Sequence, residues 1–153
     1  MSIQETVLSK DLLHEVEKIH RADILVGIPS LNNKDTITQV VRAAQYGLAK
    51  YFPRQKAVLI NSDSGSTDGT REIVQKTHVY TEMDTIFVEH RFKPARTMVT
   101  PHFGLPGKGN AFHTIFEVAV RLGVKACVVV DSDLRSITPE WIELLASPVL
   151  LKN

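Results

Sequence analysis

Cysteines and long apolar runs are scarce in this 153-residue sequence. The single cysteine, Cys127, excludes an intrachain disulfide framework, and we expect it to be a small buried apolar side chain. No apolar run approaches the roughly 18 residues that a membrane-spanning helix needs. Residues 1–21 form a charged, helix-like segment that is unlike a secretory signal. We therefore expect a cytoplasmic protein without a membrane span.

An excess of charge of either sign is also lacking. The 18 Lys and Arg residues nearly balance the 17 Asp and Glu residues, and the formal net charge is +1. This balance gives no reason to expect nucleic acid or an anionic membrane as a partner. The length suits one domain that buries about two-thirds of the surface exposed by the unfolded chain. We predict that this domain covers 22–153 and follows a helical extension over 1–21.

Three common ligand-binding signatures are missing. The segment Gly27–Asn32 follows the first predicted strand but does not match the dinucleotide fingerprint G-x-G-x-x-G. A phosphate-binding P-loop around Lys108 would need glycine where the sequence has His102. The nucleophile elbow G-x-S-x-G of hydrolases does not occur. These absences argue against dinucleotide binding, P-loop chemistry and serine hydrolysis.

The sequence does contain the alternation of apolar patterns that is typical of an α/β protein. Apolar runs predict strands over 22–28, 57–60, 85–89 and 126–130, and helical periodicity predicts helices over 8–18, 37–48, 71–76, 112–120 and from 138 onward. This order predicts a Rossmann-like, mostly parallel sheet with helices on both faces. We expect Pro29 to end the first strand, Asn33 or Asp35 to cap the next helix, and the first helix to be an appendage.

A long aperiodic segment from His90 to Lys108 interrupts this alternation. It is rich in proline and glycine and carries several basic residues. Unstructured loops of this length inside compact domains are usually functional or mobile. We expect this segment to be one of these.

Two carboxylates follow the apolar run Ala126–Val130. The run predicts an inner strand buried on both faces, and residues two apart in extended backbone point the same way. Asp131 and Asp133 would then aim their oxygens beyond the carboxyl end of the strand, where open α/β sheets hold ligands. Two hard anionic ligands suit Mg²⁺ or Mn²⁺, completed by water and substrate phosphates. A turn or helix cap explains the pair equally well.

The loops after Ile28, Ile60 and Val130 should open at one edge of the sheet. In a parallel sheet the carboxyl ends of all strands meet at the same edge, so three loops that are distant in sequence would converge. The convergence predicts a binding site at that edge.

Four motifs lie in or next to these loops: PSLN at 29–32, DSGSTDGT at 63–70, PGKGNA at 106–111 and VDSD at 130–133. Together they resemble nucleotide-sugar glycosyltransferases of the GT-A fold, the family-2-like group. Within that group the chain is most similar to glucosyl-3-phosphoglycerate synthases and related retaining enzymes. The likeness runs from about Ile24 to the end of the sequence.

The resemblance implies that the chain is the donor-binding half of such an enzyme. This half would bind a UDP- or GDP-sugar with Mg²⁺ or Mn²⁺ through a DxD motif, for transfer to a small acceptor such as a phosphoglycerate. The resemblance also implies that Pro29, Ser30 and Leu31 wall the nucleobase and ribose. Asp63 and Ser64 would contact the edge of the base.

The resemblance places the metal and the diphosphate near the Asp pair. Asp133 would ligate the metal directly, and Asp131 would bind the metal through water or hold ribose or sugar hydroxyls. Ser132 would belong to the nucleotide-sugar site, and Lys108 would reach the diphosphate or the sugar. Asn33 would contact ribose or base, although the family often has an acidic residue at that position.

Other interpretations remain open at this point. Asp63 and Asp68 could cap the helix that begins near Thr70, and Lys108 could be a solvated loop residue. The chain could be a non-catalytic nucleotide-binding or assembly module, whereas the missing glycine-rich loop disfavours a sugar nucleotidyltransferase. Four histidines share no ligand spacing, and we interpret them as surface or loop residues: His78, His90, His102 and His113.

The acceptor-binding part of a GT-A enzyme has no counterpart in this sequence. We assign no catalytic base, and we expect a fragment or a split subunit. A four-stranded sheet would leave an open edge and an apolar flank, so we expect self-association or a partner chain.

Overall fold

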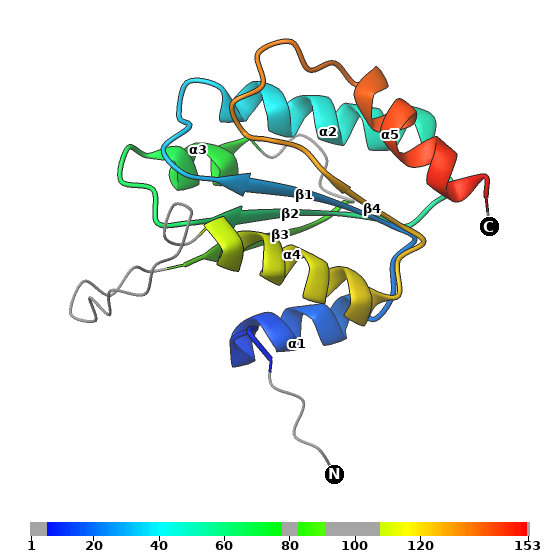
Figure 1. The fold of residues 1–153 in the computed structure, drawn as a ribbon, viewed down its shortest axis with the longest axis horizontal. Coiled ribbons are helices and arrows are strands. Elements are labelled where there is room, and N and C mark those ends of the chain that lie inside the picture. The colour runs from blue at the N-terminus through cyan, green and yellow to red at the C-terminus, as the bar shows by residue number, and fades with distance from the viewer. Residues whose placement is uncertain (1–5, 78–82, 91–107, 153) are drawn as a thin grey trace.

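The fold is an α/β arrangement of four strands and five helices, seen in a computed structural model that describes residues 6–77, 83–90 and 108–152 (Figure 1). In chain order the elements are α1 (Lys10–Ile19), β1 (Ile24–Ser30), α2 (Ile37–Tyr51), β2 (Ala57–Asp63), α3 (Thr70–Lys76), β3 (Asp84–Glu89), α4 (Lys108–Leu122), β4 (Ala126–Val129) and α5 (Glu140–Leu150). The expected order of elements is confirmed.

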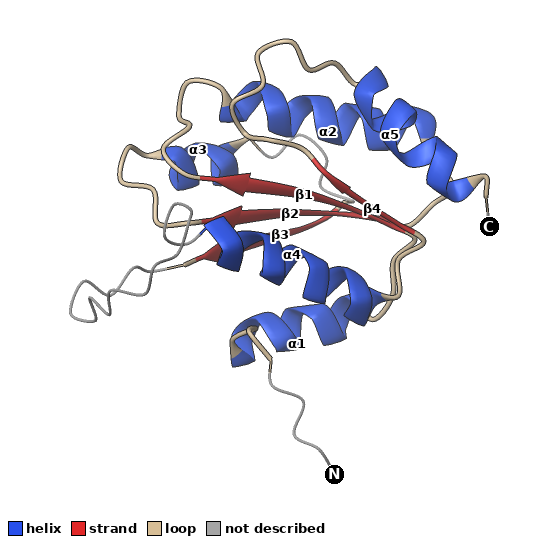
Figure 2. Cartoon of the chain, in the orientation of Figure 1, coloured by secondary structure: helices blue, strands red, loops and turns tan. Residues whose placement is uncertain are grey.

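All four strands are parallel, in the order β3-β2-β1-β4. Helices α2, α3 and α5 cover one face of the sheet, and α1 and α4 cover the other (Figure 2). The predicted Rossmann-like fold with helices on both faces is therefore confirmed. No helix among the described residues is long and apolar enough to cross a membrane.

The prediction that Ala126–Val130 is an inner strand is wrong. In the described sheet β4 is an edge strand, and Cys127 and Val129 are partly exposed. The inner strands are β2 and β1, and every residue of β1 is buried. Helices on both faces cover β4 as well, so its residues are apolar even though no described strand pairs with its outer edge. An apolar run alone therefore does not distinguish an edge strand from an inner one.

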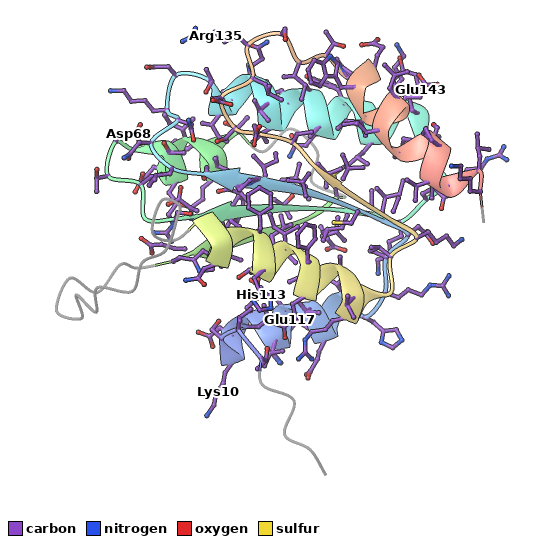
Figure 3. All side chains as sticks on the ribbon, viewed as in Figure 1. Lys10, Asp68, His113, Glu117, Arg135 and Glu143 are labelled. Atoms are coloured by element: carbon purple, nitrogen blue, oxygen red, sulfur yellow. The ribbon has the colours of Figure 1, made fainter. Side chains whose placement is uncertain are left out.

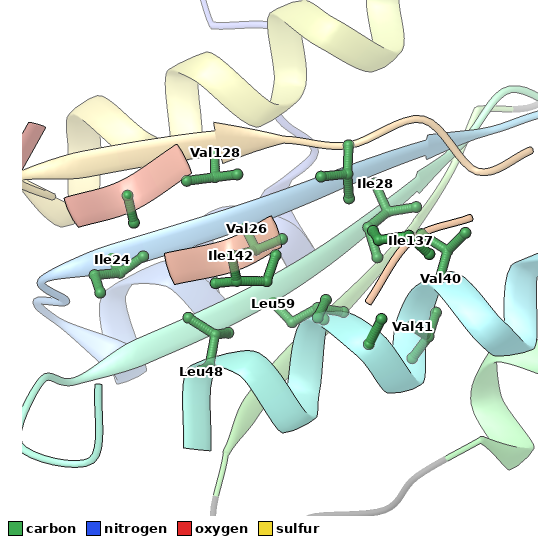
Figure 4. Close-up of a cluster of buried hydrophobic side chains, with 14 of the residues drawn as sticks. Ile24, Val26, Ile28, Val40, Val41, Leu48, Leu59, Val128, Ile137 and Ile142 are labelled. Carbon is green, nitrogen blue, oxygen red and sulfur yellow. The ribbon is translucent and has the colours of Figure 1, made fainter. Parts of the chain in front are cut away.

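The core has two parts, one on each face of the sheet. Between the sheet and α2 and α5, branched apolar side chains interlock, including Val26, Leu48 and Ile142 (Figure 4). On the other face Leu12 and Val16 of α1 are buried in the same cluster as residues of α4. The expectation that the first helix is an appendage is therefore wrong, because its apolar face completes this second core.

Glu117 of α4 strengthens the attachment of the N-terminal segment. Its carboxylate accepts hydrogen bonds from the Thr6 hydroxyl and the Val7 N–H, and it pairs with Arg121 at 3.0 Å (Figure 3). Burial acts to raise the pKa of Glu117, but these bonds outweigh it and the pKa lies below its usual value. Residues 6–8 are thus tied to α4 by hydrogen bonds to a carboxylate as well as by apolar packing.

We expected Pro29 to end the first strand, but β1 continues to Ser30. Alternate residues of a strand bond to opposite neighbours, and Ser30 O accepts the Ser64 N–H on the β2 side. Pro29 therefore faces the β4 side, where strand pairing stops at Gly27. Because no ladder bond is needed there, the missing N–H costs nothing.

The expected caps of α2 are also wrong. The N-cap residue is Thr36, which makes no side-chain cap bond, and Asn33 serves the helix only through its backbone carbonyl. The Asn33 side chain instead accepts hydrogen bonds from the Leu31 N–H and the Ser132 hydroxyl. Helix α4 begins at Lys108, before the expected position, and the rest of the expected loop, 91–107, lies outside the described residues.

Candidate functional site

A cavity of about 240 Å³ opens at the carboxyl edge of the sheet. It is formed by the loops that follow β1, β2 and β4, so the predicted convergence of these loops is confirmed. Eight predicted site residues line it: Pro29, Ser30, Leu31, Asn33, Ser64, Asp131, Ser132 and Asp133. Of the other two predicted site residues, Asp63 lies behind the cavity wall, and Lys108 begins α4 with a side chain outside the described set.

The Asp pair reaches the cavity by a different backbone path from the one predicted. Strand β4 ends at Val129, and Ser132 and Asp133 lie in a turn rather than in extended backbone. Both Asp131 and Asp133 are exposed and line the cavity. No hydrogen bond or ion pair engages either carboxylate within the described part of the chain. Both carboxylates are therefore free to bind a cation.

The residue between them is buried and held on two sides. Ser132 Oγ donates to Asn33 Oδ1 at 2.5 Å, and Ser132 O accepts from Thr36 Oγ1 at 2.7 Å. One helical turn further along α2, Gln39 Nε2 donates to Arg135 O at 2.5 Å. The turn that carries the two carboxylates is thus fastened to the start of α2.

Asp63 is fully buried at the end of β2. Its carboxylate accepts four hydrogen bonds: from Ser30 Oγ at 2.7 Å, Ser66 Oγ at 2.6 Å, Gly65 N at 3.0 Å and Ser66 N at 2.7 Å. These bonds shape the loop after β2 and hold it against the end of β1. Ser64, which follows Asp63, is the residue of this loop that lines the cavity.

Asp68 joins the loop after β2 to the loop after β1, beside the start of α3 (Figure 3). One carboxylate oxygen accepts the Thr70 N–H at 3.0 Å, and the other accepts the Lys34 N–H at 3.2 Å. Partial burial acts to raise the pKa of Asp68, but the Thr70 hydroxyl and these N–H groups lower it below its usual value. Asp68 therefore satisfies a first-turn donor of α3, although the N-cap residue itself is Gly69.

His90, which we interpreted as a surface or loop residue, is half-buried in a loop and does not line the cavity. His90 follows β3 at the same edge of the sheet, and its Nε2 lies 2.9 Å from the Oγ of the buried Ser62. The backbone N–H of His90 donates to the backbone carbonyl oxygen of Asp63 at 2.7 Å. Burial lowers the pKa of His90, and the charge of Asp63 opposes this effect. The sequence did place His90 directly after a predicted strand, and this position indicates that the residue lies at the carboxyl edge of the sheet.

We expect the protein to lose stability in weak acid partly through His90. Because the pKa of folded His90 lies below the ordinary value of 6.5, the unfolded chain binds this proton more readily. The free energy of unfolding should then decrease as the pH falls from 6.5 toward the lowered pKa. In urea unfolding between these pH values, the free energy of unfolding of His90→Gln should change less with pH than that of the parent. The matched control is His14→Gln on the exposed side of α1; an unchanged slope in His90→Gln would contradict the assignment.

Within the described residues, no group of three or more His, Cys, Asp or Glu side chains is placed to hold a metal ion. A cation at Asp131 and Asp133 would therefore need further ligands from a bound molecule or from water. This is the usual arrangement for Mg²⁺ in phosphate-binding sites.

The fold matches the GT-A fold of solved enzyme structures. Solved structures of Mycobacterium tuberculosis glucosyl-3-phosphoglycerate synthase are similar to it at 21% sequence identity and a TM-score of 0.52, with 88% of this chain and 44% of that chain covered. Its complex with Mn²⁺, UDP and glucosyl-3-phosphoglycerate gives 22% identity, a TM-score of 0.53, and coverages of 98% and 46%. Its complex with Mn²⁺, UDP-glucose and phosphoglyceric acid gives 22% identity and a TM-score of 0.53, with 97% of this chain and 45% of that chain covered.

The chain therefore spans less than half the length of these enzymes. No protein-family model matches the sequence, and no curated protein matches it. At this level of identity the likeness establishes the fold, and it agrees with the fold implied by the four motifs.

Proposed function

We propose that this chain binds the nucleotide-sugar donor of a metal-dependent glycosyltransferase, with a UDP- or GDP-sugar as donor. The observation that carries the proposal is the cavity in which Asp131 and Asp133, unpartnered within the described residues, lie beside Pro29 and Leu31. The similar enzyme structures support it, because they contain Mn²⁺ with UDP or UDP-glucose. By the same likeness a phosphoglycerate is the proposed class of acceptor.

The residues present fit Mg²⁺ or Mn²⁺. Two exposed carboxylates from one turn supply hard oxygen ligands, and diphosphate oxygens and water would complete the shell. Asp133 is the proposed direct ligand, and Asp131 the proposed second ligand or a partner of ribose and sugar hydroxyls. When bound, the cation offsets the negative charge that develops on a departing nucleoside diphosphate.

The rest of the cavity would hold the nucleoside. Pro29 and Leu31 offer apolar surface to a base, and Ser64 lines the cavity from the loop after β2. The Ser30 hydroxyl donates to Asp63 and accepts from Asn61 Nδ2 at 3.0 Å, so Ser30 shapes the wall with its hydroxyl already engaged. Lys108, in the first turn of α4, is the proposed cationic contact to the diphosphate, where the helix N-terminus also favours negative charge.

Calorimetric titration of UDP, GDP and ADP with and without Mn²⁺ tests the proposal. We expect Mn²⁺ to raise the affinity for one diphosphate at least about tenfold, equivalent to about 1.4 kcal/mol, in the parent but not in Asp133→Ala. Asp35→Ala is the matched control, because Asp35 is exposed on a neighbouring loop and does not line the cavity. Equal metal dependence in the parent and Asp133→Ala would refute the metal site.

A second measurement separates sugar transfer from binding alone. Incubation with UDP-glucose, Mn²⁺ and a phosphoglycerate, followed by assay of released UDP, supports transfer if release depends on the acceptor. Metal-dependent binding without any release would instead identify a nucleotide-binding module.

A further inference from the structure

The side chain of Asn33 connects two of the three loops that form the cavity, and its backbone reaches the start of α3, which follows the third loop. Its Oδ1 accepts the Leu31 N–H at 2.9 Å and the Ser132 hydroxyl at 2.5 Å. Its N–H donates to Thr70 Oγ1 at 2.9 Å. The loops after β1 and β4 and the start of α3 therefore share one asparagine, although its partner Ser132 lies 99 residues further along the chain.

The orientation of the Asn33 amide follows from these partners. The Leu31 N–H can only donate, so the amide atom that it contacts must be the oxygen. The oxygen then receives two hydrogen bonds and holds Ser132 rather than a ligand hydroxyl. This arrangement gives Asn33 a role different from the ribose or base contact that the resemblance implied.

The position of Ser132 gives this bond a consequence for the metal ligands. Ser132 is 6% exposed, whereas Asp131 and Asp133 on either side are exposed and have no partner in the described part of the chain. Nothing among these residues holds the two carboxylates directly. Their spacing is set by the turn, and the turn is held by Ser132 through Asn33 and Thr36.

We propose that Asn33 is a positioning residue that pre-orders the Asp131–Asp133 turn, so that cation affinity depends on the Asn33–Ser132 bond. The inference rests on the proposed function for its effect on cation binding. A turn that is ordered before the cation arrives loses less conformational freedom on binding, and removing the bond transfers that cost to the binding step. Asn33 itself does not ligate the cation.

Hydrogen exchange of the ligand-free protein tests the link without any nucleotide. The Val130 N–H, at the start of this turn, donates to Gly27 O at 3.0 Å. We expect this amide to exchange about tenfold faster in Asn33→Ala and in Ser132→Ala than in the parent, since each variant removes the same tether. Asn33→Asp keeps an acceptor oxygen in the place of Oδ1 and should retain the protection of the parent. Asp35→Ala serves again as the control. Unchanged exchange in both alanine variants would overturn the proposal.

Titration of UDP with and without Mn²⁺ tests the consequence. We expect Asn33→Ala to remove about tenfold of the gain in UDP affinity due to Mn²⁺, a larger loss than any change in metal-free UDP affinity. The double variant Asn33→Ala/Ser132→Ala should be no worse than either single variant. Equal losses with and without metal would show that Asn33 contacts the nucleotide, and additive losses would show independent roles; either result overturns the inference. A parent without any metal effect would refute the proposed function, while hydrogen exchange would still decide whether Asn33 holds the turn.

Discussion

Replacement of Asp63 with alanine is expected to lower the free energy of unfolding by at least about 3 kcal/mol, because buried donors would lose a charged acceptor. Asp63 is fully buried, and its two oxygens receive four hydrogen bonds from Ser30, Gly65 and Ser66. The two hydroxyls can turn toward other acceptors, but the N–H groups of Gly65 and Ser66 are fixed by the backbone. Urea unfolding followed by circular dichroism measures the loss.

Two variants place this result on a scale. Asp63→Asn keeps one acceptor oxygen and should lose less stability than Asp63→Ala. Asp68→Ala removes another carboxylate of the same loop, one that accepts a hydrogen bond from the start of α3. This change should lower the free energy of unfolding by about 1 kcal/mol, as for other cap contacts. If Asp63→Ala and Asp68→Ala were equally stable, the buried carboxylate would have no special structural role. Water would then have to accept the hydrogen bonds that Asp63 accepts in the parent.

The burial of Asp63 shows the limit of local sequence patterns. A stretch of Asp, Ser, Gly and Thr predicts a turn before a helix, and that turn is present. Whether its first carboxylate faces a ligand, a helix end or the interior depends on Ser30, which lies 33 residues earlier in the chain. Such a pairing exists only after β1 and β2 are side by side, so the local pattern could not reveal it.

The Asp131–Asp133 turn shows the same limit in another form. The strand pattern predicted correctly that a strand ends just before the two carboxylates and that neighbouring loops converge there. It gave the wrong backbone path, because an apolar run indicates where burial ends but not how the chain turns afterwards. The contacts of Ser132 with Asn33 and Thr36 determine that path, and each spans more than 90 residues of sequence.

Replacement of Gly47 with alanine is expected to destabilise the protein by roughly 2 kcal/mol, the usual cost of overpacking a closed interface. In an open helix this change would instead stabilise by up to about 1 kcal/mol. Here the added Cβ would lie 2.5 Å from the Pro139 carbonyl oxygen and 2.8 Å from Ile142 Cβ. Neither atom can rotate away, because one is backbone and the other belongs to a fully buried side chain. Helix α5 must therefore move away from α2.

Gly109→Ala is the matched control for this change. Gly109 is also helical, but an added Cβ there would meet nothing within 4 Å, so the free energy of unfolding should stay equal or rise slightly. Urea unfolding compares the two variants, and equal stability would mean that the α2–α5 interface adapts without cost.

The displacement of α5 should also reach the cavity. The segment between Asp133 and α5 packs into the core through Ile137, and Thr36 at the start of α2 holds the carbonyl of Ser132. Moving α5 away from α2 pulls on this segment from its far end, while Thr36 and Asn33 hold the near end. We therefore expect Gly47→Ala to weaken Mn²⁺-dependent UDP binding although position 47 does not line the cavity. Calorimetry at a temperature where the variant is fully folded measures this loss, and unchanged metal dependence would show that the turn is insulated from the helix interface.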